Sequence, residues 1–380
     1  MRLLLSGGGT GGHVYPALAV AEEWNRLLEG VGSASQVLYV GTEDGLEGGI
    51  VTRAGLAFDS VCAAGLLGVS RRQRLHNVLD LLRGTVQAWR ILRRFRPNVV
   101  LATGGYASAP VAVAAWLQRC AVMLYLPDIQ PGLAVGALSW LAARVAVSFD
   151  ASLSYFRGRR AKVIVSGYPV RAALYRQDKQ GARERLGLLA GWKTLLVFGG
   201  SRGAQSINQA VDQALDRLLK LAQVIHITGE ADLPRMAQRK EGLPRDQRSR
   251  YRPYGYLHDE MVDALHAADL AVARAGAATM GEFAAAGLPS ILVPYPYAGR
   301  HQEANADFMV DRGAAVKVAD GELATGAWVD HVEGLLNNEQ TLQPMSQSAR
   351  NLARPDAAQV IAAELVRLAG LQKVLEAGGT

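Results

Sequence analysis

The sequence predicts an α/β protein with two Rossmann-like domains, whose parallel sheets face each other across a central cleft. A short apolar stretch runs into a glycine-rich turn and a helix at Arg2–Gly12, and the same order returns at Thr194–Ala204. After each opening unit, apolar stretches alternate with helical ones, as in a parallel sheet with crossover helices. Ligands of such sheets bind at the carboxyl ends of the strands, so both glycine turns are expected to border the site.

In the first half, we expect an opening strand at Arg2–Ser6 and a helix that starts near Pro16 and ends near Gly30. Proline suits the first helical turn, and glycine suits the position after the last one. The further strands are expected at Val37–Val40, Val99–Ala102, Val122–Leu126 and Val163–Val165. Because a turn-rich exit follows at Ser166–Pro169, we predict the first domain over residues 1–166.

In the second half, Thr194–Phe198 is the expected opening strand, with a helix from about Gln205. The further strands are expected at Val224–Ile227, Leu270–Ala273, Ser290–Val293 and Ala315–Val318. These elements give a second domain over residues 167–355. The remaining segment, 356–380, carries a helix near Asp356–Leu371 that is expected to pack back on the body, on a domain that periodicity does not identify.

The composition describes a globular protein, since 49% of the 380 residues are hydrophobic, 20% are charged and 41 are glycine. Neither a bilayer-spanning apolar run nor a signal-peptide pattern is present, so we expect the cytoplasm as the compartment. The two cysteines, Cys62 and Cys120, lack metal-ligand spacing, which suits a reducing compartment.

The net charge of +7 indicates an anionic partner. Nucleic acid is the generic candidate, but the excess is concentrated in Arg71–Arg96, where eight arginines accompany a single acid, Asp80. Apolar residues recur there at helical spacing, so this segment is either a helix for an anionic membrane surface or an ordinary helix with a solvated basic face. We predict that nucleic acid is not a partner of this chain.

The stretch Ala271–Asn305 has the pattern of a phosphate site. A predicted strand is followed by Arg274 and by small residues, which begin a helix that ends at Gly287. The free N–H groups in the first turn of such a helix suit a diphosphate. Glu282 is placed to reach ribose hydroxyls. The small residues could instead serve tight packing, with Glu282 a solvated charge. The additional presence of Thr279 and of a polar group at His301, Gln302 and Asn305 favours a ligand site.

The first glycine turn differs from nucleotide-binding motifs. It carries Thr10 and His13 among its glycines, lacks a full dinucleotide fingerprint and lacks the GK[ST] ending of a P-loop. These differences argue against a nicotinamide oxidoreductase and a nucleotide hydrolase. His13 is a candidate proton acceptor, although its position alone favours a capping or structural hydrogen bond.

Taken together, five motifs resemble the MurG family of bacterial glycosyltransferases, which belongs to the GT-B class. They are GGGTGGHVYPALAV at Gly7–Val20, GGYAS at Gly104–Ser108, GYPVR at Gly167–Arg171, GGSRGAQSIN at Gly199–Asn208 and ARAGAATMGEFAAAGLPSILVPYP at Ala273–Pro296. The resemblance implies inverting transfer of N-acetylglucosamine from UDP-N-acetylglucosamine to the 4-hydroxyl of the muramyl sugar of undecaprenyl-diphospho-muramyl-pentapeptide. This step of peptidoglycan synthesis would place the chain on the cytoplasmic face of the membrane as a peripheral enzyme.

The resemblance also implies roles for individual residues. His13 would be the catalytic base, with Tyr106 nearby in the acceptor cleft, while Leu257 and His258 would read the uracil and Glu282 would bind the ribose. The other residues implied in donor binding are Thr10, Gly11, Gly12, Arg171, Ser201, Arg274, Ala277, Ala278, Thr279, Met280, Gly281, Gln302 and Asn305. No cofactor is implied, and because the sequence has no DxD motif, we expect turnover without a strict metal requirement.

One region departs from the family. Typical members carry a HEQN run after the strand that ends near Leu124, whereas this chain has Tyr125–Gln130, with Asp128 at the asparagine position. Asp128 is therefore a candidate for binding sugar hydroxyls or sharing the base role, or it is simply a turn residue after a proline. The departure keeps three alternatives open: a GT-B transferase with another acceptor, a UDP-sugar epimerase, and a UDP-sugar-binding module without turnover.

Overall fold

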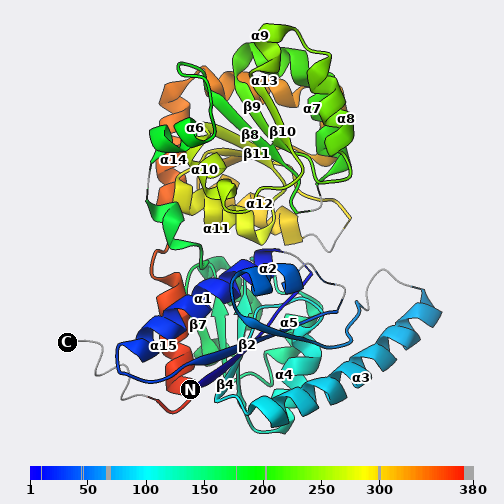
Figure 1. The fold of residues 1–380 in the computed structure, drawn as a ribbon, viewed down its shortest axis with the longest axis vertical. Helices are drawn as coiled ribbons and strands as arrows, with labels where there is room; N and C mark the ends of the chain where they lie inside the picture. The colour runs from blue at the N-terminus through cyan, green and yellow to red at the C-terminus, as the bar shows by residue number, and fades with distance from the viewer. Residues whose placement is uncertain are drawn as a thin grey trace. The chain divides into compact units, whose positions relative to one another are not determined.

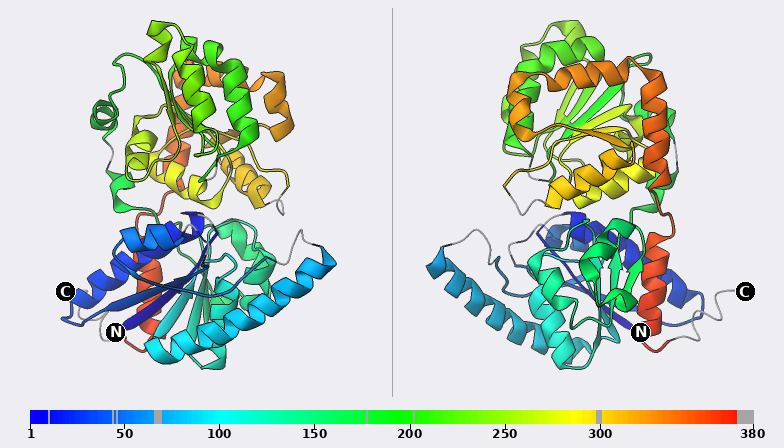
Figure 2. Two further views of the ribbon diagram at one scale, coloured as in Figure 1. Left: turned by 45° about the vertical axis from the view of Figure 1, so that its right-hand side comes forward. Right: turned by 180° about the vertical axis from the view of Figure 1, so that it is seen from behind.

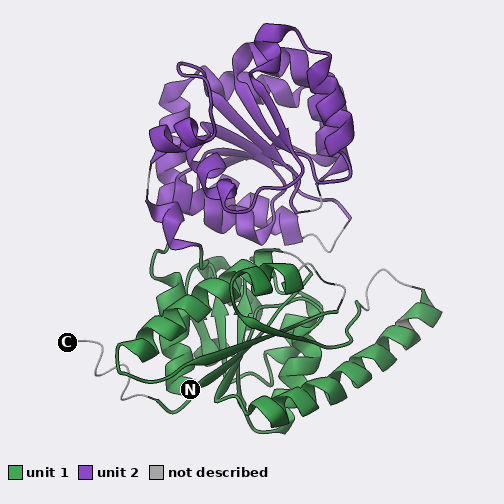
Figure 3. Ribbon diagram, in the orientation of Figure 1, with its two compact units in different colours: residues 1–170, 354–380 green, residues 171–353 purple. Residues whose placement is uncertain are grey.

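The computed structural model describes residues 1–9, 11–43, 45, 47–65, 70–176, 178–201, 203–297 and 301–371, except the side chains of residues 71, 74 and 75. The chain divides into two compact units (Figure 3). Unit 1 contains residues 1–170 and 354–380, and unit 2 contains residues 171–353. Each unit is a parallel sheet with helices on both faces (Figure 1), so the predicted pair of Rossmann-like α/β domains is confirmed.

Unit 1 is built on a seven-stranded parallel sheet in the order β3-β2-β1-β4-β5-β6-β7. Its strands are β1 Arg2–Ser6, β2 Gln36–Gly41, β3 Ala57–Ser60, β4 Val99–Ala102, β5 Ala121–Leu126, β6 Arg144–Val147 and β7 Val163–Val165. Its helices are α1 Gly11–Glu29, α2 Glu47–Arg53, α3 Arg71–Phe95, α4 Ser108–Leu117, α5 Leu133–Leu138 and α15 Ala357–Leu368, with 3₁₀ turns η1 Asp150–Phe156 and η2 Arg160–Lys162. The central strands β1 and β4 are buried on both faces, which explains their unbroken apolar sequences.

The strands expected in the first half are all present, but β3 and β6 were not predicted from the sequence. β3 is a four-residue edge strand with no fully buried residue, so its sequence has no strong apolar signal. β6 begins with Arg144, whose Nε donates to Glu364 Oε1 of α15 at 2.8 Å. A charge at a strand end is thus satisfied by a residue more than two hundred positions away, which local pattern cannot reveal.

Helix α1 begins earlier than predicted. It starts at Gly11, so Pro16 lies inside the helix and not at its first turn. A proline has no N–H to donate to the carbonyl four residues earlier, which is that of Gly12. The Tyr168 hydroxyl donates to this carbonyl at 3.1 Å. The tyrosine therefore replaces the hydrogen bond that the proline removes, and the helix extends back into the glycine turn.

The last helix, α15, belongs to unit 1 and packs against α1 (Figure 2). Buried Ile361, Leu365 and Val366 supply its apolar face. Figure 2 also shows the first half of α3 projecting from the body of unit 1, while buried Ala88 and Leu92 lie in the half that packs on α4.

Unit 2 is built on a six-stranded parallel sheet in the order β10-β9-β8-β11-β12-β13. Its strands are β8 Thr194–Phe198, β9 Gln223–Ile227, β10 Tyr251–Tyr254, β11 Leu270–Ala273, β12 Ser290–Leu292 and β13 Ala315–Lys317. Its helices are α6 Lys179–Arg185, α7 Gln205–Leu221, α8 Leu233–Glu241, α9 Arg245–Arg248, α10 Glu260–Ala267, α11 Ala277–Ala286, α12 His301–Asp311, α13 Trp328–Leu336 and α14 Glu339–Asn351, with 3₁₀ turns η3 Ala172–Tyr175 and η4 Asp320–Thr325.

The expected strands of unit 2 are present, and β10 is the one that was missed. Its sequence contains Pro253, which argues against a central strand, and β10 indeed lies at the sheet edge, where a missing N–H is tolerated. Helix α11 ends as predicted, because Gly287 adopts a left-handed conformation with φ of 62°.

Candidate functional site

In unit 1, the glycine turn between β1 and α1 closes over a buried carboxylate. Glu47 is fully buried and accepts hydrogen bonds from the Thr42 amide at 2.8 Å, the Thr42 hydroxyl at 2.6 Å and the Gly9 amide at 3.3 Å. A Cβ on Gly8 would lie 2.5 Å from Glu47 Oε1, so a larger residue there would displace the carboxylate. Sequence reasoning missed Glu47, whose position directly before the glycine pair Gly48-Gly49 carries no distinctive pattern.

His13 lies in the first turn of α1 with its imidazole fixed on two sides. Nδ1 is 2.7 Å from the carbonyl oxygen of Thr103, the residue after β4, and the Thr103 hydroxyl donates to the His13 carbonyl at 2.7 Å. A Cβ on Gly104 would lie 2.7 Å from Cε1 of the ring. Because a carbonyl only accepts, the neutral ring carries its proton on Nδ1 and its lone pair on Nε2. This is the form that a general base needs.

The other predicted residues of unit 1 follow neighbouring strands. Gly11 and Gly12 open α1 after β1, Tyr106 follows β4 and Asp128 follows β5. In the order β1-β4-β5 these carboxyl ends share one edge of the sheet with His13. Tyr106 is 58% exposed and Asp128 is half-buried. Thr10 lies outside the described residues.

In unit 2, the first turn of α11 leaves its amides without a side-chain cap. Gly276 precedes the helix in an extended conformation, and within the described residues no side chain caps this end. The Thr279 hydroxyl donates instead to the Arg274 carbonyl at 3.0 Å. The predicted Ala277, Met280 and Gly281 are buried and Ala278 is partly buried. Uncapped N–H groups at the positive end of a helix dipole suit a diphosphate.

Glu282, one turn further along α11, has a raised pKa. Burial raises its pKa from 4.5 to about 7, and the nearby charge of Arg171 opposes this rise. Arg171 in turn donates to the His258 carbonyl at 3.3 Å. The predicted uracil segment, with Leu257 buried and His258 exposed, is therefore linked through Arg171 to the side of α11 that carries Glu282.

The structure gives Arg274 a set of internal partners. Its guanidinium lies 2.6 Å from Asp320 Oδ1 and donates to the Ser206 hydroxyl at 2.7 Å and to the carbonyls of Val293 and Pro294 at 3.2 and 3.3 Å. Only 7% of Arg274 is exposed. These contacts favour a role in positioning the loops around α11. Sequence reasoning missed Asp320, which follows β13 without any motif.

The predicted amides of α12 also hold neighbouring loops. Asn305 is fully buried and donates to the Ala275 carbonyl at 2.9 Å, while Gln302 Oε1 accepts from the Tyr295 amide at 2.9 Å. Ser201 lies in the partly exposed turn after β8. Unit 2 thus brings its predicted residues to the carboxyl edge of one sheet, and their contact with a ligand stays a prediction.

None of the described helices combines the length and the apolar character needed to cross a bilayer. In the part of the chain that the structure describes, no three or more His, Cys, Asp or Glu side chains are grouped to hold a metal ion.

Comparison with known proteins identifies relatives for the whole chain. The glycosyltransferase family 28 N-terminal domain matches residues 3–147, and the family 28 C-terminal domain matches residues 194–361. A UDP-N-acetylglucosamine–N-acetylmuramyl-(pentapeptide) pyrophosphoryl-undecaprenol N-acetylglucosamine transferase from Roseiflexus sp. is 40% identical, covering 95% of this chain and 94% of the relative. The protein of the same name from Desulforudis audaxviator is 40% identical over 97% and 99% of the two chains.

Solved structures agree with these relatives. The crystal structure of MurG from Acinetobacter baumannii has a TM-score of 0.71 and 27% identity, over 96% of this chain and 99% of the other. A UDP-GlcNAc 2-epimerase from Neisseria meningitidis, solved with UDP-GlcNAc, has a TM-score of 0.66 at 14% identity, over 97% and 100% of the two chains. The second likeness shows the fold alone.

Proposed function

The chain belongs to glycosyltransferase family 28, within the MurG group, and we propose that it transfers N-acetylglucosamine from UDP-N-acetylglucosamine to the 4-hydroxyl of the muramyl sugar in undecaprenyl-diphospho-muramyl-pentapeptide. The observation that carries the proposal is the uncapped first turn of α11 beside Glu282, a pairing that suits the diphosphate and ribose of a nucleotide sugar. Residues 1–166 would serve the acceptor and the membrane, residues 167–355 the donor, and the segment 356–380 would pack on the body.

Donor binding would use the carboxyl edge of the unit 2 sheet. The amides of Ala277, Ala278 and Thr279 would bind the diphosphate, with Met280 and Gly281 completing the turn. Glu282 would accept from the ribose hydroxyls, and the segment Leu257–His258 would read the uracil. The remaining donor contacts would come from Thr10, Gly11, Gly12, Arg171, Ser201, Arg274, Gln302 and Asn305.

The transfer is an inverting displacement at the anomeric carbon. His13 Nε2 would take the proton of the acceptor's 4-hydroxyl as its oxygen forms the new bond to the anomeric carbon. The bond from this carbon to the diphosphate oxygen breaks, and UDP leaves with the electron pair. The N–H groups of α11 would stabilise the charge that develops on the diphosphate, because they are already oriented before the reaction. Tyr106 would border the acceptor.

The test is UDP release from UDP-N-acetylglucosamine, with and without a short-chain analogue of the lipid acceptor. We expect release that depends on acceptor and falls about 10²-fold or more in His13→Ala. The exposed His331, on α13 in unit 2, provides the matched control, and His331→Ala should leave the rate unchanged. Release that survives in His13→Ala would move the base role to Asp128. Tight donor binding without release would favour a binding module.

We also propose peripheral attachment to the cytoplasmic face of the membrane through α3. Four apolar side chains, Val78, Leu79, Leu82 and Val86, recur along its projecting part and are 39–60% exposed. A segment with eight arginines around such an apolar face suits an anionic lipid surface that holds a lipid-linked acceptor.

Vesicle binding tests this attachment. The chain should co-sediment with phosphatidylglycerol vesicles, and L79S/L82S should lose this binding. Substituting three exposed arginines in R83Q/R90Q/R93Q should weaken it and remove its dependence on salt, because their attraction to the surface is screened. If both sets of variants bind as the wild type does, α3 is an ordinary solvated helix.

A further inference from the structure

Unit 2 contains a pocket at the opposite edge of the sheet from the first turn of α11. The pocket has a volume of about 230 Å³ and is lined by residues just before β8, β11 and β12, namely Lys193, Asp269 and Pro289. Gly287, at the carboxyl end of α11, also lines it. Helix α11 has 10 residues, so its first turn lies about 15 Å from this pocket.

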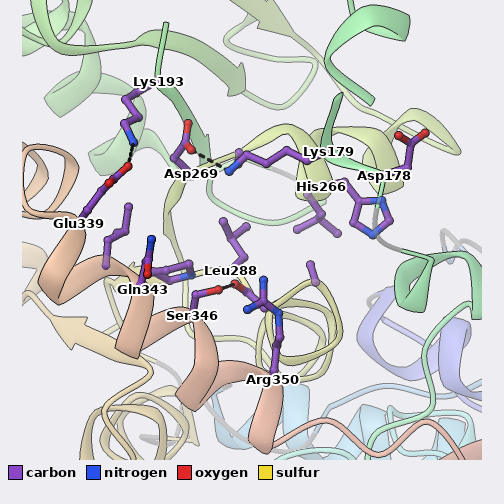
Figure 4. Close-up of a pocket in the computed structure, with 16 residues that line it drawn as sticks. Asp178, Lys179, Lys193, His266, Asp269, Leu288, Glu339, Gln343, Ser346 and Arg350 are labelled. Carbon is purple, nitrogen blue, oxygen red and sulfur yellow. Dashed lines mark hydrogen bonds and ion pairs between the residues drawn. The ribbon is translucent and has the colours of Figure 1, made fainter. Parts of the chain in front are cut away.

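The lining combines an apolar wall with one polar helix face (Figure 4). Leu265, Leu288 and Leu342 supply the apolar side chains. The polar face comes from α14, where Gln343, Ser346 and Arg350 are spaced by three and four residues and therefore point the same way. A ligand with a small apolar body and one polar head would match both surfaces.

The three acids of the pocket are already neutralised by cations. Asp269 lies 2.7 Å from Lys179 and 2.6 Å from Arg183, Glu339 lies 3.2 Å from Lys193, and Asp178 lies 3.0 Å from Arg185. Among the residues that the structure describes, the side chain of Arg350 has no hydrogen bond or ion pair. Arg350 is therefore the cation of the described lining that has no acidic partner.

Arg350 lies directly against Gly287. A Cβ on Gly287 would lie 2.5 Å from Nε of the arginine and 2.6 Å from its Cγ, so the absence of a side chain at Gly287 makes room for the arginine stem. The Ser346 hydroxyl is occupied by the Gly287 carbonyl at 2.6 Å. The guanidinium thus lies beside a glycine with its donors open to an anion.

We propose that this pocket binds a small anion, a carboxylate or phosphate on a compact apolar body, through the Arg350 guanidinium and the Gln343 amide. The inference goes beyond the proposed transfer reaction and does not depend on it. The volume lies below the range of pockets for drug-sized ligands, which points to a small metabolite. The alternative role for Arg350 is a favourable charge interaction with the carboxyl end of the α11 dipole. That interaction would require no pocket.

The experiment is calorimetric titration of the full chain with benzoate, phenyl phosphate and, as a neutral control, benzamide. We expect saturable binding at one site for at least one of the anions and none for benzamide, and the tighter anion identifies the head group. Arg350→Gln should weaken binding at least tenfold. Arg245→Gln, which removes another exposed arginine of unit 2, should leave it unchanged.

Two further arms locate the bound anion. Gln343→Trp fills the mouth of the pocket from an exposed position and should also abolish binding. Excess UDP should leave anion binding unchanged, because the proposed donor site lies at the other end of α11. Displacement by UDP, equal binding by Arg350→Gln, or no saturable binding of either anion would each overturn the proposal.

Discussion

The substitution Glu282→Gln tests the donor site through pH. The pKa of Glu282 is raised to about 7 by burial, so the carboxylate is mostly neutral below pH 7 and ionised above it. If the ionised form accepts hydrogen bonds from the ribose, the apparent affinity scales with the ionised fraction. Between about pH 8.5 and about pH 5.5 this fraction falls roughly 30-fold, and the Kd for UDP-N-acetylglucosamine should rise by the same factor.

The assay is calorimetric or fluorescence titration with UDP-N-acetylglucosamine, whose diphosphate is doubly esterified and does not titrate in this range. Glu282→Gln should bind more weakly at high pH, with a nearly flat profile. A flat profile in the wild type, or the same slope in Glu282→Gln, would refute the reasoning.

The same titration has a consequence for stability. The pKa of Glu282 in the folded protein is raised above the unfolded value of 4.5. The neutral carboxyl therefore contributes stability to the fold below pH 4.5, and this contribution is lost as the pH rises through 7. The loss amounts to at most ~3 kcal/mol, because one pKa unit corresponds to 1.36 kcal/mol. Glu282→Gln should therefore be more stable than the wild type at pH 8 and similar at pH 4.5, as measured by hydrogen exchange in α11.

Three other predictions concern buried contacts. Burial lowers the pKa of His226 to about 3, so the neutral ring contributes to folding stability above pH 6.5. This contribution is lost as the pH falls, and the loss reaches roughly 3 kcal/mol at about pH 4.5. Hydrogen exchange of β9 should show this acid sensitivity in the wild type and not in His226→Gln. Asp320→Ala leaves Arg274 buried without its carboxylate and should cost about 3–5 kcal/mol in denaturant unfolding, and a cost below ~1 kcal/mol would contradict the buried pair. Tyr168→Phe should cost about 1 kcal/mol, and less in a Pro16→Ala background, where the helix regains its own donor; equal costs in a double-mutant cycle would show that the tyrosine does not replace the proline's missing bond.

The sequence revealed the elements whose signal is local. Strands such as β1 and β8 are buried on both faces and read as unbroken apolar runs, and Gly287 marked the end of α11 because it must adopt a positive φ. The edge strands β3 and β10 escaped prediction because solvent on one side weakens their pattern. The predicted start of α1 was wrong because Pro16 is tolerated inside the helix. The Tyr168 hydroxyl, far along the chain, donates the hydrogen bond that the proline cannot make.

For the candidate site, motif positions indicated the edges of the sheets but not which side chains stay open to a ligand. Arg274 was predicted among the donor-binding residues, and the structure shows that Asp320 and Ser206, both distant in sequence, contact its guanidinium. The buried Glu47 under the first glycine turn belongs to no motif at all. Which partners a charged side chain takes is decided by tertiary packing, so residue type and spacing alone do not determine its role.

The contacts around α11 have a common consequence for its first turn. The N-cap residue is Gly276, which has no side chain, while Thr279 donates backward to the Arg274 carbonyl and Asn305 donates to the Ala275 carbonyl. Each of these side chains satisfies a carbonyl of the loop before the helix. A side-chain cap here would stabilise the helix by about 1 kcal/mol but would compete with an incoming diphosphate. The arrangement holds the loop rigid and keeps the amides open, which favours a site organised before its ligand arrives.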